Sequence, residues 1–180
     1  MKILLHTCCG PCTVGTLKEL DRNVHEITAY WYNPNIHPYL EYSSRLDSLK
    51  KLAESINMPT IIEDDYGLKK FVKMVAEDIS NRCGKCYEDR IYQTARKAKE
   101  LGFEAFSTTL LVSPYQQHNR IKQMAERIAE EIGIPFYYVD PRPHFREGNN
   151  EAREKGLYMQ KYCGCVFSEE DRYRKYRKAS

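Results

Sequence analysis

Seven cysteines in the chain of 180 residues fall into three short clusters, and none lies outside them. The clusters read Cys8-Cys9-Gly10-Pro11-Cys12, Cys83-Gly84-Lys85-Cys86 and Cys163-Gly164-Cys165. Burial alone imposes no spacing on cysteine, whereas a tight loop with glycine between two thiolates lets both reach one metal centre. The spacing therefore predicts that these cysteines bind metal.

Seven thiols are more than one metal centre takes from a protein. A zinc ion or an iron–sulfur cluster takes four, so seven divide naturally into four and three. Four thiolates suit a [4Fe–4S] cluster, which passes electrons singly, and three suit a separate ion whose open position acts as a Lewis acid. We interpret the set as a two-centre reductive site, without assigning individual cysteines to either centre. The expected ligands are Cys8, Cys9, Cys12, Cys83, Cys86, Cys163 and Cys165.

Two other uses of the cysteines stay open at this point. Structural zinc held by four of them fits the spacing as well as an iron–sulfur cluster does, but it leaves Cys12 and the Cys8-Cys9 doublet without a purpose. A redox dithiol of Cys9 and Cys12 would be similar to thioredoxin-type loops, but it leaves the other two clusters unexplained. An odd number of cysteines disfavours a framework made only of disulfides.

The elements that must position these cysteines alternate between short strands and amphipathic helices. A helix over residues 12–20 follows the first cluster, and the second cluster is expected just before a helix that carries Ile91, Ala95 and Ala98. Strands are expected at residues 2–6, 26–32, 60–63, 105–111 and 136–139. This alternation predicts one α/β domain over residues 1–180, with a five-stranded parallel sheet covered by helices. Ligands of such sheets lie beyond the carboxyl ends of the strands, where all three clusters can meet.

Composition and charge narrow the class of protein further. No stretch approaches the roughly 18 apolar residues that span a bilayer, and the first apolar run is too short for a signal peptide. We therefore expect a cytoplasmic protein with reduced thiols and no membrane partner. The net charge is only +3. Residues 166–180 are nevertheless expected to form a basic helix with interleaved tyrosines, which suits either phosphate contacts and base stacking or plain solvation.

A set of motifs runs along nearly the whole chain in a fixed order. Besides the cysteine clusters, it comprises Asn33-Pro34-Asn35-Ile36-His37-Pro38, Glu41-Tyr42-Ser43-Ser44-Arg45, the stretch from Arg82 to Arg90, the stretch from Phe106 to Pro114, and the stretch from Leu157 to Ser168. In this set the chain resembles the cobalamin-independent epoxyqueuosine reductases, the QueH family.

The resemblance implies both a fold and an activity. The fold would be Rossmann-like, of the nucleotide α-hydrolase type. The activity would be reduction of the epoxide of epoxyqueuosine to queuosine in tRNA, the last step of tRNA queuosine synthesis. The cofactors would be a [4Fe–4S] cluster and a second mononuclear metal, for which we expect iron rather than zinc. The partners would be a tRNA anticodon stem-loop carrying epoxyqueuosine and an external one-electron donor.

Removal of an epoxide oxygen also needs a proton donor and groups that hold the substrate. At the expected sheet edge the candidate acids are His37, Asp64, Asp89 and Tyr162, and the candidate substrate ligands are Asn33, Asn35, Arg45, Arg90 and Gln160. Loop fixing, helix capping, ion pairing and turn formation are the structural alternatives for several of these residues. Exposed tyrosines such as Tyr115 are candidates for stacking on unpaired bases.

Two other classes of protein compete with a reductase. A zinc-stabilised RNA-binding module would use the cysteines without redox chemistry, and an iron–sulfur electron carrier would need no substrate pocket. The polar residues that follow the expected strands count against a simple carrier.

Overall fold

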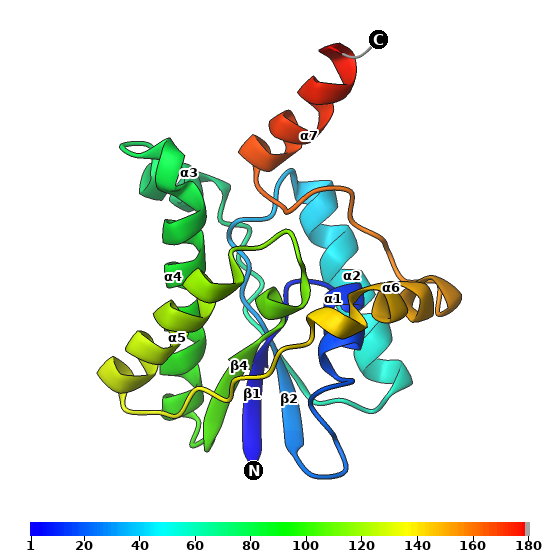
Figure 1. Cartoon of the computed structure of the whole chain (residues 1–180), viewed down its shortest axis with the longest axis vertical. Coiled ribbons are helices and arrows are strands. Elements are labelled where there is room, and N and C mark those ends of the chain that lie inside the picture. The colour runs from blue at the N-terminus through cyan, green and yellow to red at the C-terminus, as the bar shows by residue number, and fades with distance from the viewer. Residues whose placement is uncertain (179–180) are drawn as a thin grey trace.

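Four parallel strands form one sheet in the order β3-β2-β1-β4 (Figure 1). The strands of this computed structural model are β1 (Lys2–His6), β2 (Glu26–Trp31), β3 (Thr60–Ile62) and β4 (Ala105–Thr108). Leu5 of β1 is in register with Ala29 of β2 on one side and with Ser107 of β4 on the other. The structure describes the backbone of residues 1–178 and the side chains of residues 1–175.

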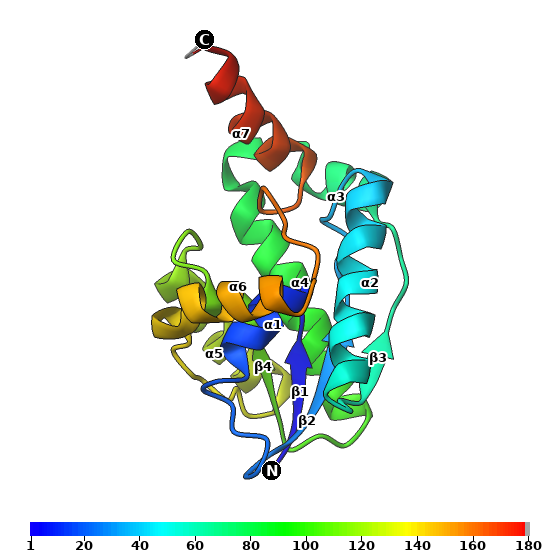
Figure 2. The same cartoon turned by 90° about the vertical axis from the view of Figure 1, so that its right-hand side faces the viewer.

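Helices cover both faces of the sheet (Figures 1 and 2). They are α1 (Gly10–Thr16), α2 (Tyr39–Ser55), α3 (Leu68–Val75), α4 (Arg82–Glu100), α5 (His118–Ile132), α6 (Phe145–Glu154) and α7 (Val166–Lys178). Successive residues of a strand point to opposite faces. Leu4 accordingly joins the core made with α4 and α5, while Ile3 and Leu5 join the core made with α2. The expected α/β architecture is confirmed.

The prediction of a fifth strand at residues 136–139 was wrong. Only Phe136 forms a β-bridge, with Phe106 of β4. Two backbone hydrogen bonds, Phe106 N to Pro135 O and Tyr137 N to Phe106 O, fix this segment to the sheet edge. Strand β4 continues for only two residues beyond Phe106, because Thr108 caps a 3₁₀ helix that begins at the next residue, and this leaves little strand for residues 137–139 to pair with.

The expected strand over residues 105–111 was therefore also too long. The 3₁₀ helix Thr109–Val112 replaces its second half. Helix α4 begins earlier than its apolar stripe indicates, so that the second cysteine pair lies in its first turns rather than in the preceding loop. The third pair lies between α6 and α7.

Helix α7 projects away from the body of the fold (Figures 1 and 2). It corresponds to the basic helix expected at residues 166–180. Residues 179–180 and the side chains of residues 176–178 lie outside the described part of the chain. Within the described part, Arg174 pairs with Glu170, and Arg82 of α4 pairs with Asp171.

Helices α1 and α6 cross in close contact. A Cβ atom on Gly148 of α6 would lie 2.6 Å from Cα of Gly15 in α1, so this crossing requires glycine. The close approach holds α1, which carries part of the first cysteine cluster, against the rest of the fold. No helix in the described residues is long and apolar enough to cross a membrane.

Candidate metal centre

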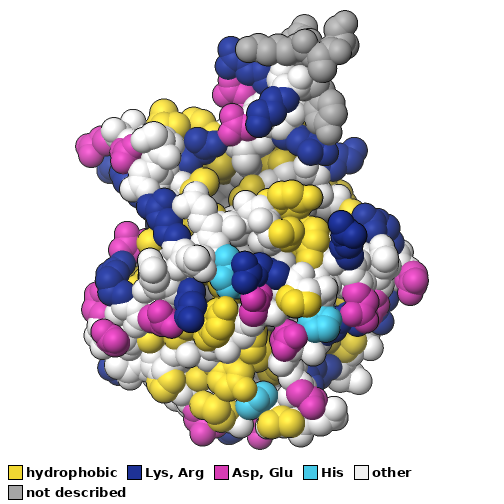
Figure 3. Space-filling view, in the orientation of Figure 1, with side chains coloured by type: hydrophobic (Ala, Val, Ile, Leu, Met, Phe, Trp, Pro, Cys, Tyr) yellow, Lys and Arg dark blue, Asp and Glu magenta, His cyan; other side chains and the backbone are white. Residues whose placement is uncertain are grey.

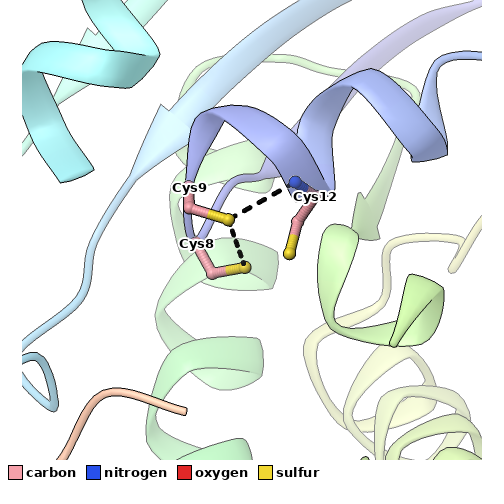
Figure 4. Close-up of side chains that lie close together, drawn as sticks. All are labelled: Cys8, Cys9 and Cys12. Carbon is pink, nitrogen blue, oxygen red and sulfur yellow. Dashed lines mark hydrogen bonds between the residues drawn. The ribbon is translucent and has the colours of Figure 1, made fainter. Parts of the chain in front are cut away.

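Cys8, Cys9 and Cys12 form a cysteine triplet at the carboxyl end of β1. Their Sγ atoms all lie within 4.8 Å of one another, and Cys8 and Cys9 Sγ are 3.9 Å apart. Figure 4 shows the three sulfur atoms turned toward a common centre. Cys9 is the extended N-cap of α1, and its Sγ accepts a hydrogen bond of 3.3 Å from Cys12 N. The local turn from strand to helix therefore gathers the triplet without help from distant parts of the chain.

Two polar side chains from elsewhere contact the triplet. Thr109 Oγ1 accepts from Cys8 N at 3.1 Å and lies 3.4 Å from Cys8 Sγ, while Gln160 Nε2 donates to Cys12 Sγ at 3.5 Å. Gln160 was among the expected substrate ligands, and the structure places it beside the metal-binding cysteines. Thr109 was not foreseen, although it lies within one of the motifs that follow the strands.

The pKa values of the three thiols of the triplet depend on one another. Hydrogen bonds from Cys12 and Cys9 hold the pKa of Cys8 well below its usual range. Burial raises the pKa of Cys9, and hydrogen bonds with Cys8 and Cys9 raise that of Cys12. Three buried sulfurs this close together resist joint ionisation, whereas a metal ion favours all three as thiolates. The donor set therefore fits a thiophilic metal ion.

The remaining four cysteines come from α4 and from the segment before α7. Cys86 and Cys165 are buried and pack with Phe71 and Val75. Burial, together with the nearby thiols of Cys163 and Cys165, raises the pKa of Cys86 to about 12, although Arg90 acts to lower it. The described residues contain one group of three or more potential ligands within 4.8 Å, namely the triplet. All seven cysteines are free thiols.

Gln116 contacts the third cysteine pair and was not predicted from the sequence. Its Nε2 donates to Cys163 Sγ at 3.2 Å, and its Oε1 accepts from the Tyr87 hydroxyl at 2.5 Å. A lone polar residue in a loop gives no sequence signal for such a contact.

Buried Arg45 holds the loop of the third cysteine pair. Its Nη1 and Nη2 atoms each donate a hydrogen bond of 2.8 Å, to the backbone oxygens of Cys163 and Tyr162. Its Nε atom pairs with Glu41 at 2.7 Å. Arg45 was expected to hold substrate, and the contacts in this structure are with the protein itself. That expectation remains a prediction.

Two of the expected acids, His37 and Tyr162, lie together. The Tyr162 hydroxyl donates to the backbone oxygen of His37, and His37 N donates to Gly164 O at 2.8 Å. The His37 ring is buried, with Nε2 3.0 Å from Pro34 O and with Nδ1 lacking a partner. Burial lowers the pKa of His37. Both residues thus adjoin the third cysteine pair.

The other two expected acids have separate partners. Asp64 is exposed after β3 and accepts a hydrogen bond of 2.9 Å from Tyr42. Asp89 follows Cys86 by three residues on α4, accepts a hydrogen bond of 3.1 Å from Tyr32 and lies 3.8 Å from Lys70 Nζ. Burial, followed by the charge of Asp89, raises the pKa of Tyr32.

Within the part of the chain that the structure describes, three buried amide oxygens near the cysteines lack a hydrogen-bond partner. They belong to Asn33, Asn35 and Gln160. Asn33 Nδ2 donates to Thr7 O beside the triplet at 2.8 Å, and the Asn35 amide adjoins Gly164. Buried polar atoms are nearly always paired in native proteins, so unpaired ones mark places where a ligand or water completes the site.

A group of buried thiols beyond the carboxyl ends of parallel strands, flanked by buried cations and unpaired amides, defines a metal-dependent α/β protein. The comparison with known families agrees with this class. The model of the family described as Epoxyqueuosine reductase QueH matches residues 3–171. The chain belongs to this family.

Similar curated proteins carry the same description. Epoxyqueuosine reductase QueH of Dehalococcoides mccartyi is 38% identical, and the match covers 97% of this chain and 96% of that protein. The protein of this name from Thermotoga maritima is 32% identical, with 99% of this chain and 95% of that protein covered. Among solved structures, the zinc-inhibited form of teicoplanin deacetylase Orf2 is 9% identical with a TM-score of 0.43, and the match covers 86% of this chain and 83% of that chain.

Proposed function

We propose that this protein reduces the epoxide of epoxyqueuosine in tRNA to queuosine. The observation that carries the proposal is the cysteine triplet, whose three sulfur atoms meet within 4.8 Å at the carboxyl edge of the sheet. A reductive centre needs such soft ligands, and membership of the QueH family supplies the reaction and the substrate. The polar surroundings of the triplet set it apart from a simple electron carrier.

We propose two metal centres with separate ligands. The triplet would hold a mononuclear ion, for which we favour iron over zinc, and Cys83, Cys86, Cys163 and Cys165 would hold a [4Fe–4S] cluster. When bound, the cluster would supply single electrons, and the ion would supply a Lewis-acidic open position. The arrangement of the chain supports this division, because the triplet is formed within one loop and the other four cysteines come from α4 and the segment that precedes α7.

The chain's own residues bind the substrate and supply protons. The unpaired amide oxygens of Asn33, Asn35 and Gln160 are free to accept hydrogen bonds from hydroxyl or amino groups of the nucleoside. Arg45 holds the third cysteine loop beside them. Loss of the epoxide oxygen as water needs protons as well as electrons, and we propose that one of the four expected acids supplies them.

Among those acids, Asp89 has the most support. It lies on the helix that carries the second cysteine pair, and its side chain is only 16% exposed. Its contacts with Tyr32 and Lys70 form a polar chain through which a proton can be replaced from solvent. Asn, which keeps the shape of Asp89 but cannot donate an acidic proton, is the diagnostic substitution.

We propose that the anticodon stem-loop approaches the face shown in Figure 3. Lys and Arg side chains are spread over this face with acidic ones between them. Tyr115 is 86% exposed and is braced edge-on by Phe145 at 5.9 Å between ring centroids, which suits an aromatic ring that stacks on an unpaired base. The electrons would come from an external one-electron donor.

The test is conversion of the modified nucleoside. Anaerobically purified protein with a chemical reductant is incubated with tRNA that carries epoxyqueuosine, and the digested nucleosides are identified by mass. We expect queuosine to appear, and we expect Cys12→Ser and Asp89→Asn to slow its formation, by about 100-fold or more for loss of a general acid. The control is Glu88→Gln, which neutralises an exposed carboxylate on the same helix and is expected to retain activity. Tight tRNA binding by metal-loaded protein without any conversion would instead indicate an RNA-binding module.

A further inference from the structure

Arg90 is a buried cation whose contacts are with cysteine. Its side chain is 2% exposed, and it lies one helical turn after Cys86 on α4. Its Nη2 atom donates to Cys86 Sγ at 3.2 Å, and its Nε atom donates to the backbone oxygen of Cys86 at 3.3 Å. The guanidinium is thus directed at a sulfur atom of the second cysteine pair.

Among the described residues, no carboxylate forms an ion pair with Arg90, whereas the other buried arginine, Arg45, pairs with Glu41. The charge of Arg90 lies close enough to Cys86, Cys163 and Cys8 to act on all three, and these cysteines belong to three different clusters.

A buried unpaired charge is strongly unfavourable, and buried charges in proteins are therefore paired or bound to ions. With neutral thiols, Arg90 lacks an anionic partner. With thiolates that hold a metal cluster, it has one. Arg90 therefore fits a protein whose cysteines carry negative charge in the loaded state.

Building on the proposed iron–sulfur cofactor, we propose that Arg90 is a positioning residue for the cluster: its guanidinium donates to Cys86 Sγ, balances the thiolate charge and raises the cluster's reduction potential. Reduction adds negative charge, which a fixed nearby cation stabilises, and hydrogen bonds to cluster sulfurs act in the same direction. This role needs no contact with tRNA. It differs from that of Arg45, which binds backbone oxygens and a glutamate rather than sulfur.

The test measures the midpoint potential of the cluster without tRNA, by a redox titration followed by electron paramagnetic resonance. We expect Arg90→Met to lower the ratio of reduced to oxidised cluster at least about tenfold at a fixed potential, which for one electron is a shift of about 59 mV. Arg90→Lys, which keeps the charge but not the forked donor, is expected to shift it less. The matched control is Arg127→Gln, whose side chain is 53% exposed and pairs with Glu88. It is expected to leave the potential unchanged.

Stability of the metal-free protein gives a second, opposite readout. Without thiolates the buried charge has no partner, so metal-free Arg90→Met is expected to be at least as stable as metal-free wild type. Folded Arg90→Met that cannot take up iron and sulfide, beside a fully loaded control, also supports the proposal. An unchanged potential in Arg90→Met, or an unfolded metal-free variant, overturns it. Wild type without bound iron and sulfide would instead remove the proposed cofactor, and with it this role of Arg90.

Discussion

Replacing Arg45 by Met should destabilise the protein far more than replacing an exposed arginine. Arg45 and its partner Glu41 have side chains that are 1% and 8% exposed, at an N–O distance of 2.7 Å. Removing one member of a buried ion pair costs about 3–5 kcal/mol, because the other charge remains buried alone. We expect a value near the lower end of this range, since Tyr158 still donates to Glu41.

The assay is thermal and denaturant unfolding of metal-loaded protein under anaerobic conditions. For a domain of this size each kcal/mol shifts the melting temperature by about 2–4 °C, so a loss of about 3 kcal/mol predicts a decrease of roughly 6–12 °C. Adding Glu41→Gln to Arg45→Met should restore part of the loss, because the remaining buried charge is then neutral. That recovery separates the ion pair from the volume of the side chain.

The matched control is Arg174→Met. Arg174 pairs with Glu170 at 2.8 Å with the same spacing along the helix, but its side chain is 69% exposed. Such exposed pairs contribute about 0.3–0.5 kcal/mol. If Arg45→Met cost less than about 1 kcal/mol, like the exposed pair, the reasoning that Arg45 anchors the third cysteine loop would be refuted.

Three further predictions concern the scaffold. Gly148→Ala should destabilise the protein by about 1–3 kcal/mol in denaturant unfolding, because the added Cβ would overlap the backbone of α1; wild-type stability would refute the close crossing. Tyr42→Phe should cost about 1–3 kcal/mol in the same assay, because it removes the hydrogen bonds to Trp31 and Asp64 and leaves the buried indole N–H unpaired; a neutral effect would contradict the network. Hydrogen bonds with two glutamates raise the pKa of His144. The contribution of His144 to the free energy of unfolding, under about 1 kcal/mol, should therefore be fully present below about pH 6.5 and should vanish as the pH rises through the raised pKa. A stability difference between wild type and His144→Gln that grows with pH would contradict this.

Local patterns predicted most of the fold. Strand β1 and helix α1 are encoded by an apolar run followed by a cysteine-rich turn, and both form within one short stretch of chain. The first cysteine cluster was predicted to bind metal, but the sequence did not show that adjacent Cys8 and Cys9 direct their sulfur atoms to one centre, 3.9 Å apart. The apolar face of α4, with Ile91, Ala95 and Ala98, was equally apparent from the spacing of apolar residues, and it packs in the core as expected.

Contacts between distant residues could not be predicted in this way. The missing fifth strand depends on where β4 stops, which Thr108 decides by capping the following turn with its hydroxyl. The contacts of Gln116 with Cys163 and of Thr109 with Cys8 join segments that lie 47 and 101 residues apart. The buried state of Arg90 is likewise a property of the packed fold, because a helix sequence alone places an arginine on the surface as readily as beside a sulfur atom.

The central claim is that the seven cysteines form two separate metal centres. The most direct test is the content of iron, acid-labile sulfide and other metals in anaerobically prepared wild type, Cys12→Ser and Cys86→Ser. We expect about four irons with about four sulfides plus one further metal in wild type. We also expect Cys12→Ser to lose the further metal alone and Cys86→Ser to lose the sulfide. One zinc without sulfide in iron-replete wild-type protein would show that the two centres do not form.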